Sequence, residues 1–206
     1  MLNYIMSLTN KDLMSLAKRM DVDLEPPVYK SQLKDMKLKY NKSYIINMED
    51  EFDYDDDGKI LGKNTGTHYT CFQVNKYKKN NRIEGVYLDS YGIAPPTDVE
   101  EFVGFKINYS KKQVQGSMVN SCGWFCCGFL HYINSYEGRS KDLYTDAMNF
   151  TEHFEDLTDS NHHLKNEWIL KHFFRSKDPQ LRRPIEVEGL DVNNISDANE
   201  RTKIVL

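Results

Sequence analysis

Cys122 has the surroundings that favour covalent chemistry at a thiol. It lies in the stretch NSCGWFCCGFLHY, where a polar segment changes into an apolar, helical one. The first turn of a helix offers unpaired backbone N–H groups and the positive end of the helix dipole, both of which stabilise a thiolate. Gly123 leaves space for a substrate backbone beside the sulfur. This position predicts a nucleophile, although burial as a structural residue is the commoner use of cysteine.

A cysteine nucleophile needs a base, and His68 is the best candidate among the six histidines. It lies in TGTHYTCF, at the start of a predicted strand, where a side chain can project from the end of a sheet. The other candidates fall in predicted helices (His153 and His172) or in a predicted polar loop (His162 and His163).

Asp89 and Gln115 complete the set of candidate site residues. Asp89 ends the predicted strand VYL and can lie near His68 if the two strands form a hairpin, although an aspartate before Ser-Tyr-Gly also suits a simple turn. Gln115 lies seven residues before Cys122. Its amide, with the backbone N–H of Cys122, can donate to a developing oxyanion. A glutamine without the other candidate residues would not indicate an oxyanion site.

Two patterns suggest metal ligands, and neither is complete. The first places four donors along one predicted helix: Cys122, Cys126, Cys127 and His131. Ligands on one helix cannot surround a tetrahedral zinc ion. The second is DYDDDGKI (residues 53–60), which has the aspartate spacing of half a calcium loop, but Asn64 replaces the bidentate glutamate. We expect no required metal or other cofactor, and a solvated loop at the acidic run.

The remaining sequence predicts an α+β domain over residues 1–180, followed by a polar tail or surface-wrapping segment over 181–206. A central, mostly antiparallel or mixed sheet would be flanked by helices, with Cys122 at the N-terminus of a buried helix. Expected helices are 9–20, capped by Thr9 and Asp12, the segment after Cys122, 143–154 and 167–174. Expected strands are 68–74 and 83–88 as a hairpin, 102–109 and 112–115, whereas 30–42 is helical or irregular.

Composition excludes several classes of protein. The chain has 206 residues, is 39% hydrophobic, and carries 27 basic against 31 acidic side chains. No apolar run approaches the roughly 20 residues that span a bilayer, and the N-terminus does not resemble a signal peptide, so we expect no membrane contact. Four cysteines are too few for a disulfide scaffold and fit reduced thiols in the cytoplasm or nucleus.

Charge is unevenly distributed along the chain. Residues 49–57 contain seven acidic side chains, so the net charge of −4 becomes +3 without them. Lysines and arginines are concentrated in two basic clusters, residues 30–42 and 76–82. Tyrosines lie within or directly beside both clusters. A merely solvated surface explains such clusters, and weak nucleic-acid binding is the alternative.

Taken together, the order His68, Asp89, Gln115, Cys122 resembles the viral cysteine proteases of the adenovirus maturation protease (adenain) type, which are related to the ubiquitin-like-protein proteases. The most specific block is VQGSMVNSCGWFCCGFLHY, with its Gln-Gly pair, the seven-residue step to cysteine and the Cys-Gly-x-Phe-Cys-Cys run. GTHYTCFQ resembles the Gly-x-His-Trp segment of that family, and VYLDSYG resembles its strand ending in an acid before x-aromatic-Gly.

The resemblance implies a viral endopeptidase, from a virophage or a related double-stranded DNA virus. It would cleave capsid and other structural precursors during virion maturation, at sites that contain glycine, as a monomer in the virion and in the host cytoplasm or nucleus. His68 would be the base, Asp89 its orienting acid, Gln115 an oxyanion donor and Cys122 the nucleophile. The alternatives are a protease that removes ubiquitin-like modifiers and a non-catalytic capsid or DNA-packaging accessory protein.

Two properties of adenain transfer poorly to this chain. Adenain is activated by a viral peptide that forms a disulfide with a cysteine located before the oxyanion glutamine, and the stretch 94–120 has no cysteine here. We therefore expect no activation of that kind. Adenain also uses DNA as a cofactor, and the acidic balance of this chain predicts at most weak stimulation.

Overall fold

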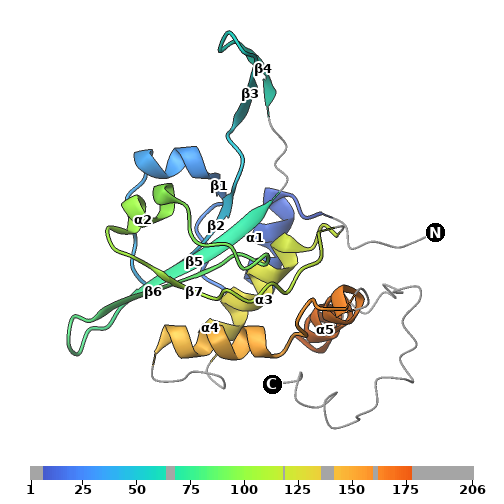
Figure 1. Ribbon diagram of the computed structural model, residues 1–206. Helices are drawn as coiled ribbons and strands as arrows, with labels where there is room; N and C mark the ends of the chain where they lie inside the picture. The colour runs from blue at the N-terminus through green and yellow to red at the C-terminus, as the bar shows by residue number, and fades with distance from the viewer. Residues whose placement is uncertain (1–6, 64–67, 118, 136–141, 160–161, 178–206) are drawn as a thin grey trace.

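A five-stranded mixed sheet forms the centre of the protein in the computed structural model, which describes residues 7–63, 68–117, 119–135, 142–159 and 162–177 (Figure 1). Its strands lie in the order β1 (Val28–Tyr29), β2 (Lys42–Asn47), β5 (Tyr69–Lys76), β6 (Ile83–Leu88) and β7 (Asn108–Tyr109). The outer pairs β1–β2 and β6–β7 are parallel, and the pairs β2–β5 and β5–β6 are antiparallel. The expected α+β class with a mixed sheet is confirmed at this level.

Both faces of the sheet are buried, because successive side chains of each central strand belong to two different apolar clusters. In β5, Cys71 packs in one cluster while Phe72 and Val74 pack in the other. The first cluster includes residues of α1 (Asn10–Arg19), α3 (Cys122–Asn134), α4 (Leu143–Glu152) and α5 (His162–Lys177). The second includes residues of the 3-10 helix η1 (Lys30–Asp35) and of α2 (Thr97–Val103).

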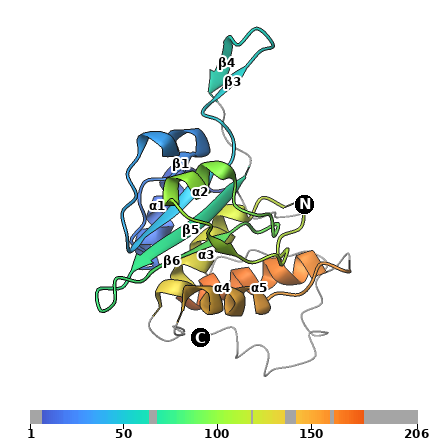
Figure 2. The same ribbon diagram turned by 60° about the vertical axis from the view of Figure 1, so that its left-hand side comes forward.

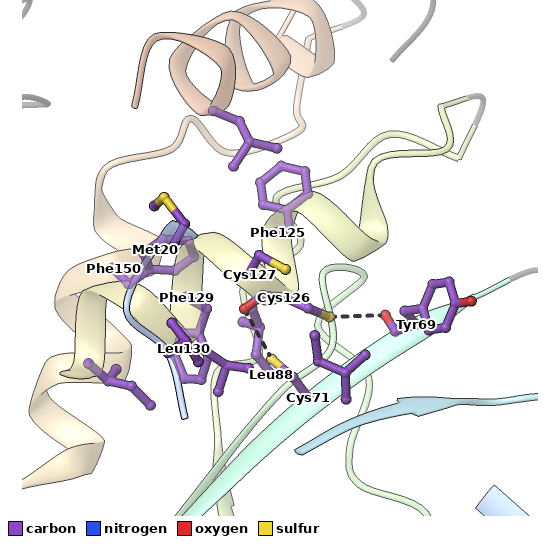
Figure 3. Packing of buried hydrophobic residues seen from close by; sticks show 14 of the residues in the cluster. Met20, Tyr69, Cys71, Leu88, Phe125, Cys126, Cys127, Phe129, Leu130 and Phe150 are labelled. Carbon is purple, nitrogen blue, oxygen red and sulfur yellow. Dashed lines mark hydrogen bonds between the residues drawn. The ribbon is translucent and has the colours of Figure 1, made fainter. Parts of the chain in front are cut away.

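Helix α3 lies against the sheet and is surrounded by the other helices of its layer, which explains why it is apolar on nearly every side. Phe125 and Phe129 are fully buried. Two cysteine contacts join the helix to β5 (Figure 3): the Cys126 thiol donates to the Tyr69 carbonyl at 3.5 Å, and the Cys71 thiol donates to the Cys126 carbonyl at 3.8 Å. These contacts fix the start of α3 relative to the start of β5.

Several local predictions are confirmed. Thr9 caps α1, and its backbone N–H in turn donates to the Asp12 carboxylate at 3.0 Å, so the capping box is complete. The hairpin of β5 and β6 pairs as expected. Helices α3 and α4 begin where the sequence indicated, whereas α5 is longer than predicted at both ends and includes His162 and His163, so the predicted loop at these two histidines is wrong.

Two predicted strands are wrong. The segment 102–109 begins inside α2, because Val99 and Val103 lie one helical turn apart and are both buried. Gly104 ends that helix in the left-handed conformation, and only Asn108–Tyr109 is a strand. The segment 112–115 is irregular, since its backbone N–H groups at Val114 and Gln115 both donate to the Ser90 carbonyl rather than to a strand ladder.

The acidic run is largely exposed, as predicted, but the prediction that it is a loop is wrong for part of it. Residues of this run form β3 (Phe52–Tyr54), which pairs with β4 (Ile60–Lys63) in a two-stranded hairpin outside the main sheet. This hairpin projects away from the rest of the molecule in both views (Figure 1 and Figure 2). Asn64 and the predicted tail 181–206 lie outside the described residues.

Candidate active site

His68 and Asp89 meet at one end of the β5–β6 hairpin. His68 directly precedes β5, and Asp89 directly follows β6. The register pairs Cys71 with Leu88, so His68 and Asp89 occupy diagonal rather than directly opposite positions. The Nε2 atom of His68 lies 3.0 Å from Oδ1 of Asp89, and the same Oδ1 accepts the backbone N–H of Tyr91 at 2.8 Å. The Asp89 side chain is almost fully buried, so both contacts are shielded from water.

Cys122 lies beside the same end of the sheet, as the first residue of α3. Its sulfur accepts a hydrogen bond from the backbone N–H of Tyr69 at 3.4 Å. Tyr69 is the neighbour of His68 in the chain, so this bond links the thiol to the residue next to the candidate base. The structure thus brings together a thiol, an imidazole and a carboxylate from three separate segments.

The electrostatics of His68 favour the imidazolium form. Burial lowers the pKa of His68, but the hydrogen bond with Asp89 and the interactions with Cys122 outweigh it and raise that pKa to about 9. Nε2 is engaged by Asp89, whereas Nδ1 is buried and makes no hydrogen bond of normal geometry within the described residues. Nδ1 is therefore the ring nitrogen that remains for proton exchange with Cys122.

Gln115 is fixed in the same region by several polar contacts, including a hydrogen bond from the Gln113 side chain to its backbone carbonyl at 2.9 Å. Its Nε2 donates to the Val119 carbonyl at 2.7 Å and to the Tyr91 hydroxyl at 3.2 Å, and its Oε1 accepts from the Ser90 hydroxyl at 2.8 Å. Its backbone N–H donates to the Ser90 carbonyl at 3.0 Å. Both amide hydrogens are already engaged, so donation to an oxyanion requires Gln115 to release one of these partners.

Tyr91 is a site residue that our sequence reasoning did not identify as functional. Its ring centroid lies 4.7 Å from that of His68, and its hydroxyl contacts Gln115. The aromatic residue two places after Asp89 was visible in the sequence, but its contacts depend on the turn that follows. Gly92 has a φ of 72°, and a Cβ atom there would lie 2.4 Å from the Lys111 carbonyl oxygen. A glycine at this position lets the segment that holds Gln115 approach the turn.

Glu167 is a second residue that the sequence did not reveal. It lies in α5, and its carboxylate accepts a hydrogen bond from the hydroxyl of Ser121, the residue directly before Cys122. Burial raises the pKa of Glu167 to about 7, against the opposing effects of Ser121 and Lys171. Its neighbour Asn166 donates to the Val114 carbonyl at 3.0 Å. Helix α5 therefore supports both segments that carry Gln115 and Cys122.

The other cysteines have surroundings unlike those of Cys122. Cys126 and Cys127 are buried within α3, and burial raises the pKa of each thiol far above its ordinary value. A thiol that resists ionisation is a poor nucleophile. The packing of Figure 3 accordingly gives Cys126 and Cys127 a structural role.

The described residues contain no group of three or more histidine, cysteine or acidic side chains that could hold a metal ion. In the calcium-like run, Oδ1 of Asp55 accepts the backbone N–H groups of Asp57 and Lys59, which closes the β3–β4 turn. Within the same described ranges, no helix is long and apolar enough to cross a membrane.

Comparison with known proteins adds no relative from which a role could be transferred. The sequence matches no known protein family and no curated protein at a significant level.

Proposed function

We propose that the protein is a cysteine endopeptidase with Cys122 as nucleophile, His68 as base and Asp89 as orienting acid. The observation that carries this proposal is the meeting of three groups at the start of α3, the start of β5 and the end of β6. A histidine held between a buried carboxylate and a thiol is the arrangement that activates a cysteine. The raised pKa of His68 supports a thiolate–imidazolium pair at neutral pH.

In the proposed reaction, His68 takes the Cys122 proton and the thiolate attacks the scissile carbonyl carbon. The negative charge that develops on the carbonyl oxygen is stabilised by the backbone N–H of Cys122 at the start of α3, and by Gln115 once its amide releases Tyr91. The tetrahedral intermediate collapses when His68 returns the proton to the leaving amine, which leaves a thioester on Cys122. Water then attacks the thioester with His68 as base, releasing the acid and the free enzyme.

We further propose that the fold is of the adenain type and that the substrates are capsid and other structural precursors of a virus, cleaved at sites that contain glycine. This part depends on the resemblance of VQGSMVNSCGWFCCGFLHY to the adenain block. The arrangement of α3 against β5, with Cys122 next to His68, is compatible with it.

Alkylation by iodoacetamide, followed by peptide mass analysis, tests the nucleophile. Cys122 should react much faster than the other cysteines, and Cys122→Ala should abolish both the rapid labelling and the cleavage of a glycine-containing precursor peptide. Cys126→Ala is the matched control: it should keep rapid labelling at Cys122 but lower thermal stability. Faster labelling of Cys126 or Cys127 would contradict the assignment. Rapid labelling with cleavage of ubiquitin-like fusions alone would instead favour a modifier-removing protease.

A further inference from the structure

The β3–β4 hairpin, with its flanking residues 49–51, spans residues 49–63 and is named the arm; it begins next to the candidate active site. It follows β2 in the chain and precedes β5, and β2 and β5 are antiparallel neighbours. The backbone N–H of Met48, just before the arm, donates to the carbonyl of His68 at 2.9 Å. The arm therefore projects from the end of the sheet at which His68, Asp89 and Cys122 meet (Figure 1).

The arm exposes large apolar side chains. The residues Tyr54, Ile60 and Leu61 are 54%, 53% and 68% exposed, whereas large apolar residues are more often buried. Tyr54 and Ile60 are paired across the hairpin, so their side chains share one face. A two-stranded hairpin is marginally stable alone, and an exposed apolar surface of this kind marks a site of interaction.

The charge of the arm selects the type of partner. It contains seven carboxylates and two lysines, a net charge of −5. Such a surface repels nucleic acid and anionic lipid, and it attracts lysine and arginine side chains. Strands of a projecting hairpin also leave backbone groups on their outer edges, to which an extended peptide can add as a further strand.

We propose that the arm is a docking surface for an extended, basic segment of the protein substrate, with apolar residues between its lysines or arginines. This inference rests on the proposed peptidase function and adds a substrate class to it. The apolar residues of the segment would cover Tyr54, Ile60 and Leu61, while its cations face the carboxylates. Because the arm begins one residue after Met48, whose backbone bonds to His68, a segment held on the arm raises the effective concentration of its cleavage site at Cys122.

Direct binding tests the arm without requiring catalysis. The Cys122→Ala protein is titrated with a fluorescent peptide of alternating lysine and apolar residues, and anisotropy is followed from about 50 to about 200 mM salt, a range in which exposed charge interactions are progressively screened. Tyr54→Thr/Ile60→Thr keeps strand-forming residues and should weaken binding about tenfold. Asp56→Asn/Asp57→Asn should weaken it severalfold at low salt and less at high salt.

Matched variants control for general changes of surface. Tyr144→Ala removes an exposed aromatic residue from α4, and Asp98→Asn/Glu101→Gln removes two exposed charges from α2; neither should change the affinity. With active enzyme, the arm variants should lower kcat/KM for precursors that carry the basic segment, and leave hydrolysis of a short peptide unchanged.

The outcomes separate this inference from the proposed function. Arm-dependent binding by a protein that cleaves no peptide would support the docking surface and contradict the peptidase. Cleavage of a peptide by a protein whose arm variants bind as tightly as the wild type would support the peptidase and contradict the docking surface. Equal binding of an uncharged peptide would overturn the charge argument. Self-association that is lost in Tyr54→Thr/Ile60→Thr would show that a second copy of the chain, rather than a substrate, covers the arm.

Discussion

The hydroxyl of Tyr91 accepts a hydrogen bond from Nε2 of Gln115 at 3.2 Å, and the Tyr91 ring lies against His68. The backbone N–H of Tyr91 also donates to Asp89. One residue therefore contacts three of the four candidate site residues. This makes Tyr91 a positioning residue that couples the orientation of the base to that of the oxyanion donor.

Replacing Tyr91 separates the contribution of its hydroxyl from that of its ring. Tyr91→Phe keeps the ring against His68 but removes the hydroxyl that orients the Gln115 amide before it turns to the oxyanion, so we expect kcat to fall about fivefold, the equivalent of one neutral hydrogen bond. Tyr91→Ala should lower kcat much further, because His68 also loses its packing. Steady-state kinetics with thermal denaturation as the folding control provide the measurement. Wild-type kcat in Tyr91→Phe would rule out a positioning role for the hydroxyl.

Gln115→Ala should lower kcat by about 10² to 10³ with little change in KM, the usual loss for one oxyanion donor. Gln115→Glu should be at least as damaging, because a carboxylate would face both the developing charge and the Val119 carbonyl. Since Gln115 is buried and bonded, both variants should also unfold at lower temperature, and kcat must be measured below that transition. Near-wild-type turnover in both would place the oxyanion site elsewhere.

The raised pKa of His68 predicts where activity declines at alkaline pH. The imidazolium is present below about pH 9, so kcat/KM should fall as pH rises through that value. Asp89→Asn removes the contact that raises this pKa most, and should move the alkaline limb to lower pH. It should also reduce activity less than His68→Ala, which removes the base itself. An alkaline limb that stays in place in Asp89→Asn would contradict the role of Asp89.

The same pair should contribute to stability with a definite sign. The pKa of His68 is higher in the folded protein than its ordinary 6.5, so the contribution is complete below about pH 6.5 and is lost as pH rises through about 9. The difference in melting temperature between the wild type and Asp89→Asn should therefore shrink between pH 6 and pH 10. A constant difference over this interval would show that Asp89 acts only through packing.

The elements with a strong local signal were predictable from the sequence. The capping box of α1 and the hairpin of β5 and β6 depend on neighbouring residues, so pattern alone located them. Strand β2 was not predicted, because its apolar residues from Tyr44 onwards are buried on both faces of the sheet and so do not alternate with polar ones. Helix α2 was not predicted, and its last two residues were included in the predicted strand 102–109, because short apolar runs do not distinguish helix from strand.

The partners of the site residues were predictable only in part. His68 and Asp89 lie at the adjacent ends of two strands that the sequence predicted to pair, so their contact could be expected. Glu167 could not, because it lies 46 residues after Ser121 and depends on how α5 packs against α3. Long-range contacts of this kind are set by tertiary packing, which no local pattern encodes.

Glu167→Gln should change the pH dependence of stability. Burial raises the pKa of Glu167 from 4.5 to about 7, so the wild type loses stability as pH rises from about 4.5 to about 7, by at most about 3 kcal/mol. Glutamine has no charge to bury, so the variant should gain stability relative to the wild type across this range. Urea denaturation at pH 5 and pH 8 measures the difference, with the exposed Glu152→Gln as control. An equal difference at both values would contradict the buried titration.

The two basic clusters, 30–42 and 76–82, adjoin one another in the structure. The backbone N–H of Lys76 donates to the Asn41 side chain at 3.1 Å, and Lys76 Nζ lies 5.5 Å from the ring centroid of Tyr40. Several of their charges are already paired with acids: Lys39 with Glu25, Lys42 with Asp23 and Arg82 with Glu84. A shared surface with partly neutralised charges predicts a few phosphate contacts, enough for weak, sequence-independent binding.

Duplex DNA should therefore bind weakly at low salt and should not be required for activity. The peptidase rate is compared with and without DNA from about 20 to about 200 mM salt, where binding through a few phosphate contacts falls steeply. Lys78→Gln/Lys79→Gln should remove any stimulation, while Lys11→Gln/Lys18→Gln on α1 should not, because those lysines lie outside both clusters. Strong stimulation that survives the highest salt would mean that the paired lysines exchange their acidic partners for phosphate, and that DNA is a cofactor here as it is for adenain.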